Sequence, residues 1–343
     1  MKKALVVLLC SVTALSFLAG CSKNGKTEPA AENSAKGEKL IIYSPLTESM
    51  ITSMCSMFEK DTGIDVECLA MGTGDALKRI ETEANSPQAD ILWSGTIGTV
   101  KSKSQFFADY TCINESAFYD QYKNTEGNLT RFDTIPSVIM INKNLIGTIK
   151  ITGYADLLNP ALKGKIAYAD PQASSSSFEH LVNMLYAMGN GNPDNGWDYV
   201  KKLCKQLDGK LLGGSSAVYK GVADGEYTVG LTFEQGAAQY VGAGAPVSVI
   251  YMKEGVIFRG DGVYIIKGCP NEANARKFVD WLTTKDVQTY MNSTQFRRTI
   301  RKDVPPTDAM AAIDTIHVIT DDENYSAAHK AEWLAKFKDI FTE

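Results

Sequence analysis

The sequence has few of the residues, and none of the short motifs, that metal binding and catalysis usually require. It contains only three histidines and no C-x-x-C pair, so a metal site rich in histidine or cysteine is not expected. The local motifs of serine hydrolases, P-loop nucleotide-binding proteins and zinc peptidases are missing, and no G-x-G-x-x-G follows a predicted strand. We therefore expect no resident metal, no cofactor and no enzymatic activity.

An excess of positive charge is also missing. The formal net charge is −5 at pH 7, which argues against nucleic acid as a partner because nucleic-acid binding needs a basic surface. Hydrophobic residues make up 44% and charged residues 22% of the 343 residues, as in globular proteins. The length is sufficient for two domains.

Only the N-terminus carries a long apolar run. Lys2 and Lys3 precede an apolar stretch over 4–17, and Leu18-Ala19-Gly20-Cys21 resembles the bacterial lipobox. We expect a signal peptide over 1–20, cleavage before Cys21 and a lipid on that cysteine, which would anchor the exported protein to the cell envelope. The alternative is an ordinary signal peptide followed by an incidental cysteine. Residues 21–38 contain no bulky apolar side chain and are predicted to form a flexible tether.

The remaining cysteines are scattered. Of seven cysteines in the chain, two lie at positions 10 and 21, which leaves 7 − 2 = 5 in the globular part. An odd number without regular spacing predicts mostly buried, inert thiols, and whether any two form a disulfide stays open. The five are Cys55, Cys68, Cys112, Cys204 and Cys269.

Short apolar runs alternate with amphipathic stretches in two blocks, which predicts parallel sheets flanked by helices. The first block has strands over 40–43, 64–69 and 89–93 with helices between them, and the second has strands over 166–169 and 227–233. We expect two α/β lobes, the first from 39–137 and 259–343 and the second from 138–258. The apolar segments 138–142 and 247–258 are predicted to pass between the lobes.

Hydroxyl-bearing turns follow the predicted strands at their carboxyl ends, where ligands bind in open α/β sheets. Hydroxyls beside a helix N-terminus offer hydrogen-bond donors without a formal cation, which favours an anion such as phosphate or carboxylate. The alternative is that each turn only caps its helix, and Ser176 and Glu179 have capping-box spacing. The candidates in these turns are Ser44, Thr47, Thr73, Gly74, Ser94, Thr96, Ser174, Ser175 and Ser176.

Four further residues are candidates for the same site. Ser215 opens a helix after two glycines, and Thr232 lies near the end of a strand. Glu234 follows that strand and could accept hydrogen bonds from an amine or from hydroxyls, or could be a solvated carboxylate at a helix start. Arg259 could clamp an anion with two hydrogen bonds or form a salt bridge between the lobes.

The order and spacing of several segments resemble bacterial ABC-transporter substrate-binding proteins, in the ferric-ion-binding and phospho-organic-binding branch of the type II periplasmic binding fold. This resemblance implies two lobes, each a mixed, mostly parallel sheet flanked by helices, joined by crossing strands. It also implies a monomer that captures a small anionic solute and delivers it to a permease driven by a separate ATPase. The segments that carry it include Tyr43-Ser44-Pro45, 58–63, Gly72-Thr73-Gly74, 89–93, 156–160 and 275–282.

The resemblance leaves more than one solute open. Ferric-binding members carry adjacent tyrosines after a strand of the second lobe, whereas this chain reads Leu231-Thr232-Phe233-Glu234-Gln235-Gly236 there and has no adjacent tyrosines anywhere. We therefore expect a phosphorylated or phosphonate organic compound, with iron(III) as the alternative. A secreted hydrolase that uses Ser215 or Ser176 with His180, and a sensory module that docks on a receptor, are the remaining hypotheses.

Overall fold

The computed structural model describes residues 39–305 and 307–343, apart from the side chain of Thr96. The predicted signal peptide, the tether and the lipid-bearing Cys21 lie outside the described residues. Among the helices that are described, none has the length and apolar character needed to cross a membrane.

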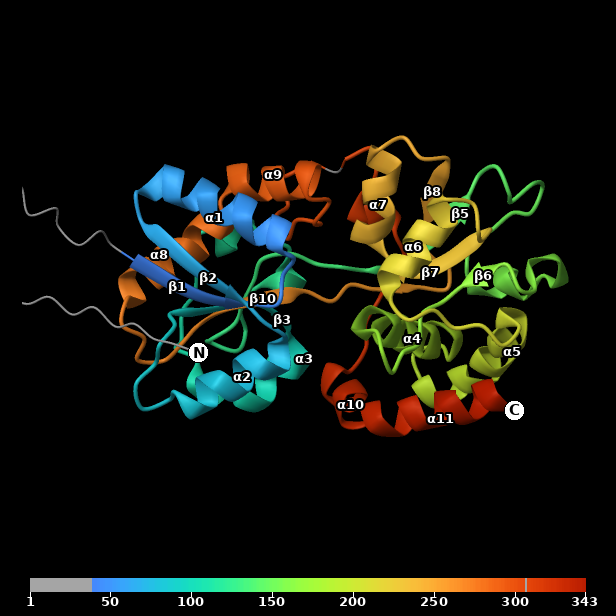
Figure 1. The fold of residues 1–343 in the computed structure, drawn as a ribbon, viewed down its shortest axis with the longest axis horizontal. Helices are drawn as coiled ribbons and strands as arrows, with labels where there is room; N and C mark the ends of the chain where they lie inside the picture. The colour runs from blue at the N-terminus through green and yellow to red at the C-terminus, as the bar shows by residue number, and fades with distance from the viewer. Residues whose placement is uncertain (1–38, 306) are drawn as a thin grey trace, which may run out of the picture. The chain divides into compact units, whose positions relative to one another are not determined.

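The first lobe is built on a five-stranded sheet in the order β2-β1-β3-β10-β4 (Figure 1). The first three strands are parallel, β10 runs antiparallel to β3, and β4 runs antiparallel to β10. The strands are β1 (Lys39–Ser44), β2 (Asp65–Ala70), β3 (Ile91–Thr96), β4 (Thr130–Arg131) and β10 (Asp261–Ile265). The helices are α1 (Glu48–Thr62), α2 (Thr73–Thr82), α3 (Ile97–Val100), α8 (Glu272–Leu282) and α9 (Lys285–Thr294).

Helical spacing of apolar residues explains how α1 covers this sheet. Met50, Met54 and Phe58 recur every four residues and are buried, so they form one face of the helix. Phe58 packs against Phe278 of α8 with 5.1 Å between ring centroids. The helix ends at Gly63, whose φ of +74° suits glycine.

The second lobe is built on a four-stranded sheet in the order β6-β7-β5-β8. Strands β6 and β7 are parallel, whereas β5 is antiparallel to β7 and to β8. The strands are β5 (Ser137–Asn142), β6 (Ile166–Ala167), β7 (Val229–Phe233) and β8 (Val247–Ile250), and the helices are α4 (Ser175–Met188), α5 (Trp197–Leu207), α6 (Ser215–Ala223) and α7 (Glu234–Gly242). Apolar side chains of α4 pack with Leu231 on one face, and those of α6 and α7 pack with Val138 on the other.

The prediction that 138–142 and 247–258 pass between the lobes is wrong for most of their length. The structure places 138–142 in β5 and 247–250 in β8, which pair with each other inside the second sheet. The run 138–142 is an inner strand whose two faces both find apolar partners, whereas 247–250 is the edge strand that pairs with it. The chain passes between the sheets at 132–136 and 258–260, where Ile135 N donates to Arg259 O at 2.8 Å.

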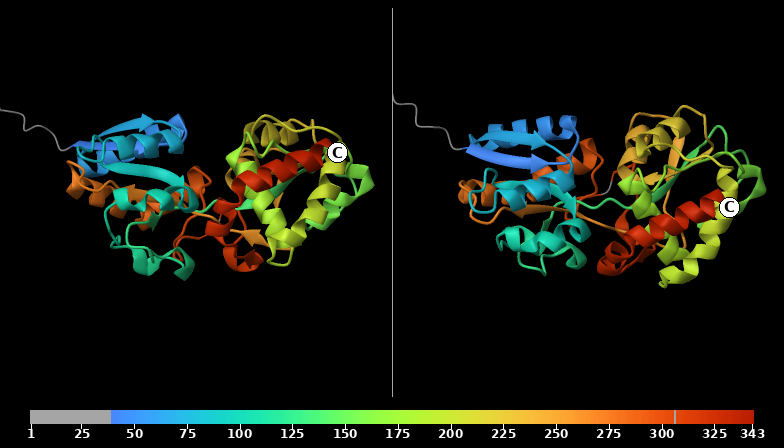
Figure 2. Two further views of the ribbon diagram at one scale, coloured as in Figure 1. Left: turned by 90° about the horizontal axis from the view of Figure 1, so that it is seen from below. Right: turned by 60° about the horizontal axis from the view of Figure 1, so that its bottom comes forward.

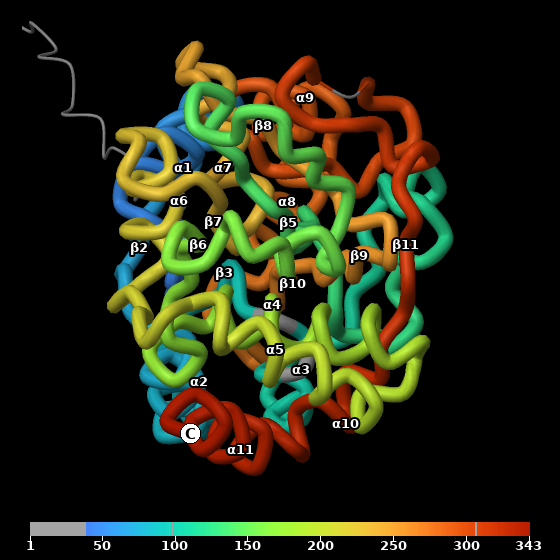
Figure 3. Tube along the Cα trace, turned by 90° about the vertical axis from the view of Figure 1, so that its right-hand side faces the viewer, coloured from blue at the N-terminus to red at the C-terminus, as the bar shows by residue number. Residues whose placement is uncertain are grey.

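The C-terminal segment differs from the predicted division into lobes. The buried residues of the first core end at Ile300, whereas Trp333 and Phe337 belong to the core of the second lobe. They lie on α11 (Lys330–Thr342), which packs against α5 (Figures 2 and 3). The i, i+4 spacing of these two rings provides the apolar face that docks there. Strand β11 (Val318–Ile319) pairs in parallel with β9 (Val256–Ile257), and α10 (Glu323–Ala328) lies between β11 and α11.

Candidate functional site

Three predicted turns of the first lobe meet at the carboxyl end of its sheet. Ser44 Oγ donates to Trp93 O at 2.8 Å and accepts from Leu46 N at 3.2 Å. Gly95 lies so close to Thr73 that a methyl group on it would be 3.1 Å from Thr73 Cγ2, and its φ of +128° also favours glycine. The turns after β1, β2 and β3 therefore share one edge, as the sequence predicted, but the buried Ser44 hydroxyl is already satisfied by the fold.

Ser94 is also committed to the fold. Its φ is +83°, a left-handed conformation that is uncommon for residues other than glycine, and its hydroxyl donates to Asp261 Oδ2 at 2.8 Å. Asp261 in turn accepts from Arg297, which pairs with the buried Asp133 at 2.6 Å. This network holds the end of β3 in place. Of the other candidates in this lobe, Thr47 and Gly74 are exposed, and the Thr96 side chain lies outside what is described.

Thr232 and Ser215 reach the same end of the second sheet. A methyl group on Gly230 would meet Val218 of α6, so Gly230 and Thr232, two residues apart on β7, face α6. Thr232 lies closer than Gly230 to the end of β7, and Ser215 lies one turn before Val218, at the start of α6. Thr232 and Ser215 are therefore at the same end of the sheet. The Thr232 hydroxyl is buried, the residue being 3% exposed, and has no hydrogen-bond partner. A buried hydroxyl without a partner is costly unless a ligand or water completes it.

The start of α4 lies at this edge as well. His180 of α4 is 3.1 Å from Thr232 O through Nδ1, so the first turns of α4 extend past the end of β7. Ser174 is the N-cap and accepts from Ser177 N at 3.3 Å, while Ser174 and Ser176 hydroxyls are 3.1 Å apart. Ser175 is exposed. The expected capping box of Ser176 and Glu179 is therefore wrong, because Ser174 takes the capping position.

Glu234 forms a buried ion pair rather than a solvated helix-start carboxylate. It is 1% exposed and accepts from Arg298 through Nε at 2.9 Å and Nη2 at 2.5 Å. The hydroxyl of Tyr251 donates to the same carboxylate. Since Arg298 follows α9 of the first lobe and Glu234 begins α7 of the second, this pair joins the two lobes.

Arg259 forms the salt bridge that the sequence offered as the alternative to an anion clamp. It lies in the crossing segment 258–260 and pairs with Glu179 of α4 at 2.6 Å and with Asp321. Burial raises the pKa of Glu179 to about 7, although Arg259 opposes the shift. Glu234 and Arg259 are therefore both engaged in salt bridges within the fold.

The run of arginines after α9 was not among the residues predicted for the site. Arg297, Arg298 and Arg301 are between 6% and 8% exposed, and each pairs with a carboxylate. Arg297 and Arg298 lie between Phe296 and Ile300, and Arg301 follows Ile300 directly. This pattern could have indicated buried ion pairs, because apolar neighbours bury a cation, which then needs a counter-charge.

Among the described residues, His180 is not joined to the serines named in the hydrolase hypothesis. His180 is fully buried, and burial lowers its pKa to about 4, so its ring is neutral. Within 39–305 and 307–343, no hydrogen bond joins His180 to a serine hydroxyl, since its Nδ1 faces Thr232 O. In the same part of the chain, no group of three or more His, Cys, Asp or Glu side chains could hold a metal ion.

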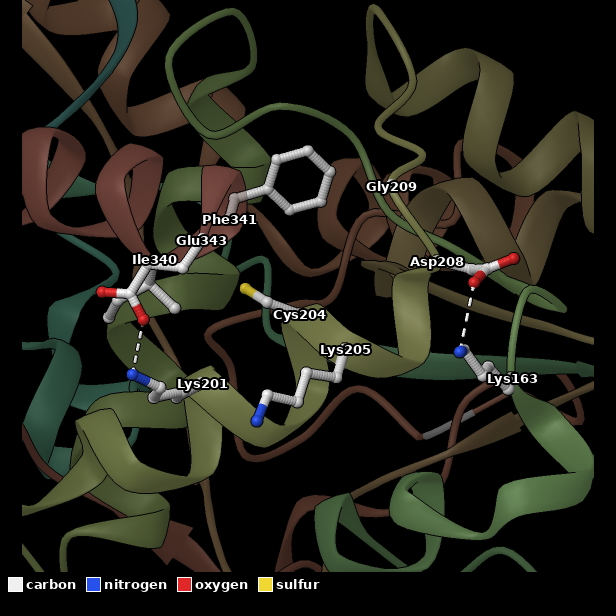
Figure 4. Close-up of a pocket in the computed structure, with 9 residues that line it drawn as sticks. All are labelled: Lys163, Lys201, Cys204, Lys205, Asp208, Gly209, Ile340, Phe341 and Glu343. Atoms are coloured by element: carbon white, nitrogen blue, oxygen red, sulfur yellow. Dashed lines mark hydrogen bonds and ion pairs between the residues drawn. The ribbon is translucent and has the colours of Figure 1, made fainter.

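A surface pocket of about 540 Å³ lies away from these turns, between α5 and the end of α11 (Figure 4). Three lysines line it, but Lys163 pairs with Asp208 at 3.4 Å and Lys201 pairs with Glu343 at 2.5 Å. None of the candidate residues from the sequence lines this pocket. Two of its three lysines are therefore paired with carboxylates that also line the pocket, and it lies apart from the hydroxyl-bearing edges of the sheets.

The sequence matches one protein family and is similar to several known proteins. Residues 53–318 match the family of bacterial extracellular solute-binding proteins. Iron uptake protein A1 of Synechocystis sp. is 22% identical over 315 residues, which are 88% of this chain and 86% of that protein. A Salmonella typhimurium protein named as a 2-aminoethylphosphonate-binding periplasmic protein is 24% identical over 73% of this chain and 74% of its own length.

The fold has a close counterpart among solved structures. The periplasmic binding protein AfuA from Actinobacillus pleuropneumoniae, solved with fructose-6-phosphate bound, is 25% identical. The TM-score is 0.73, and the match covers 90% of this chain and 99% of AfuA. The predicted two-lobed type II periplasmic binding fold is confirmed.

Proposed function

Because the chain belongs to the bacterial extracellular solute-binding protein family, we propose that it captures a small phosphorylated or phosphonate organic anion and delivers it to a permease. The coarser function follows from the family: the chain is the periplasmic-type solute-binding component of an ABC transporter. The class of solute is our proposal. It is based on the carboxyl end of the second sheet, where Thr232, Ser215 and the start of α4 lie, which we call the second-lobe edge.

The unpaired hydroxyl of Thr232 is the observation that carries the proposal. It faces α6 near Ser215, while the backbone carbonyl of Thr232 contacts His180 of α4 on the other face of the sheet. The first backbone N–H groups of both helices lack intrahelical partners and carry a partial positive charge. Neutral hydroxyls and N–H groups that meet at one edge suit a phosphoryl group, whose oxygens accept several hydrogen bonds.

Two of the three relatives support this chemistry by their names. AfuA was solved with a sugar phosphate, and the Salmonella protein is named for an aminophosphonate. Both compounds present a phosphorus-bound oxyanion attached to a polar organic group. The part of the edge that is rich in hydroxyls would bind the oxyanion.

Iron(III) is the second candidate, favoured by the relative named as an iron uptake protein. Iron(III) needs hard anionic ligands such as phenolates. Tyr251, one of two separate tyrosines near the relevant strand, donates to Glu234, and burial raises its pKa well above the usual value. A tyrosine held protonated by a buried carboxylate is a poor iron ligand, so the phosphorus oxyanion is preferred.

We also propose that the protein is exported by its N-terminal signal and held at the envelope by a lipid on Cys21. The supporting observation is the sequence Leu18-Ala19-Gly20-Cys21 after an apolar run. Labelling of the expressed protein with a radioactive fatty acid, and its loss in Cys21→Ser, tests this point separately from solute binding.

Thermal-shift measurements test the solute class. Fructose 6-phosphate and 2-aminoethylphosphonate at about a hundred times their Kd should stabilise the protein by about 2.7 kcal/mol. Fructose and inorganic sulfate serve as controls for the sugar and for charge alone. No shift with any phosphorus compound, together with a shift and visible colour on adding iron(III), would assign the protein to iron instead.

A further inference from the structure

Cys55 of α1 and Cys68 of β2 lie opposite each other, and the packing of the two elements explains why. Because β1 and β2 are parallel, the helix that connects them runs antiparallel to β2. Glu59 Oε1 accepts from Val66 N at 2.9 Å, which fixes one point of register between helix and strand. One turn back from Glu59 is Cys55, about 6 Å along the helix. Two residues on from Val66 is Cys68, about 7 Å along the strand in the same direction.

The two thiols are in contact. The Cys55 and Cys68 side chains interact with each other. Cys55 is buried under the helix at 8% exposure, whereas Cys68 is half-buried on β2, the outermost strand of its sheet. One thiol of the pair is therefore accessible to a reagent in solution, and the other lies directly behind it.

The other three thiols have a different environment. Cys112, Cys204 and Cys269 are all buried, and burial raises the pKa of each. In the part of the chain that the structure describes, none of them is hydrogen-bonded to another thiol. The odd count of five therefore resolves into one facing pair and three single buried thiols, which are expected to be inert.

We propose that Cys55 and Cys68 are a modification site that forms an intramolecular disulfide when the exported protein meets an oxidising disulfide. The proposal depends on export to a compartment where disulfides persist, and not on which solute the protein binds. The Cys68 thiolate attacks one sulfur of the donor disulfide, forms a mixed disulfide and releases one donor thiol. The Cys55 thiolate then attacks Cys68 Sγ and releases the second donor thiol. Two protein thiols lose two electrons and two protons, and the donor disulfide gains both.

The bond would join α1 to the edge strand that leads to the turn at Thr73. It closes a loop of 68 − 55 + 1 = 14 residues, which lowers the entropy of the unfolded chain. The edge of the first sheet and the turn after β2 would become harder to unfold locally.

Peptide mapping of the full chain tests the proposal. The reduced protein is incubated with oxidised glutathione, and free thiols are then alkylated under denaturing conditions. We expect one linked pair of peptides that contain Cys55 and Cys68, a mass lower by about 2 Da, and a melting temperature higher by about 5 °C. Alkylation of both cysteines after oxidation, or a link between other cysteines, would overturn the proposal.

Two variants make the test specific. Cys68→Ser changes the half-buried thiol and should abolish both the link and the oxidation-dependent rise in melting temperature. The control Cys204→Ser should keep both. Thermal shift with fructose 6-phosphate is measured on the same oxidised and reduced samples. Failure to bind solute with a link still formed would then count against the proposed function alone.

Discussion

The carboxyl ends of the two sheets carry similar side chains but use them differently. In the first lobe, the hydroxyls of Ser44 and Ser94 donate to Trp93 O and to Asp261 within the fold. In the second lobe, the Thr232 hydroxyl has no partner, although it is just as deeply buried. A hydroxyl after a strand is thus a binding candidate only where the fold offers it no acceptor.

The strand pairings explain this difference. The ladder between β1 and β3 pairs Ile42 with Ile91 and Tyr43 with Leu92, so Ser44 comes next to Trp93 where the ladder stops. A carbonyl at that position is free for a side chain. Thr232 instead lies opposite Val138, in an inner strand whose α6 face is lined by apolar residues such as Val218. No acceptor lies within hydrogen-bond distance of the Thr232 hydroxyl there.

The largest effect is expected from Glu234→Gln, since Glu234 is the one second-lobe edge candidate that is committed to an ion pair. Loss of its charge leaves Arg298 buried without a counter-charge, which should lower the free energy of unfolding by about 3–5 kcal/mol. Urea unfolding measures the change. The exposed Glu226→Gln is the matched control, and equal unfolding midpoints for the two variants would contradict this description of Glu234.

The next effect is expected from Ser215→Ala, at the edge with uncommitted donors. Loss of one hydrogen bond to a charged phosphoryl group should cost about 1.5–3 kcal/mol of binding, which is about tenfold or more in affinity. Stability should change by less than about 0.5 kcal/mol, because Ser215 makes no side-chain hydrogen bond among the described residues. Calorimetric titration with fructose 6-phosphate measures the affinity, and an unchanged Kd would contradict a binding role for Ser215.

Ser44→Ala should show the reverse pattern. It leaves Trp93 O without its donor in a buried position, which should lower the free energy of unfolding by about 1–3 kcal/mol. Affinity for the same sugar phosphate should stay within a factor of about three, since the hydroxyl is used inside the fold. A tenfold loss of affinity in a stable Ser44→Ala protein would show that the first-lobe edge also binds the solute.

Away from the two edges, an effect on the pH dependence of stability is expected at the crossing between the lobes. Burial raises the pKa of Glu179 to about 7 in the folded state, above the usual value of about 4.3. Arg259 and Lys330 oppose this shift, and Asp321 and Glu323 add to it. Between these two pH values the folded state holds the proton more tightly, so stability should fall as pH rises from about 4.3 to 7. Glu179→Gln should flatten this slope in melting temperatures measured from pH 5 to pH 8, and an equally steep slope in the variant would contradict it.

The periodic features of the sequence were sufficient to predict the sheets and their helices. The run 64–69 became β2, and the helix expected before it became α1, because a buried face repeats at a fixed interval in each. The family and the two-lobed fold were also predicted correctly from the order of these segments. The C-terminal helix was assigned differently, since a short apolar face on Trp333 and Phe337 does not identify the lobe that it contacts.

The partners of individual polar side chains could not be predicted in the same way. Ser94 and Asp261 are 167 residues apart, and Glu234 and Arg298 are 64 residues apart. Such contacts depend on the packing of whole lobes, and no local pattern encodes them. The sequence therefore predicted which turns lie at the sheet edges, but not which hydroxyls stay free once the lobes have formed.

The hydroxyl of Thr232 allows the most direct test of the proposed site. Thr232→Val removes this single hydroxyl and keeps the shape of the side chain, and calorimetric titration with fructose 6-phosphate and 2-aminoethylphosphonate compares it with the unchanged protein. We expect equal or higher stability, because no partner within the fold is lost, and at least about tenfold weaker binding of the phosphorus compound. Undiminished affinity in a folded Thr232→Val protein would contradict the second-lobe edge as the binding site for the oxyanion.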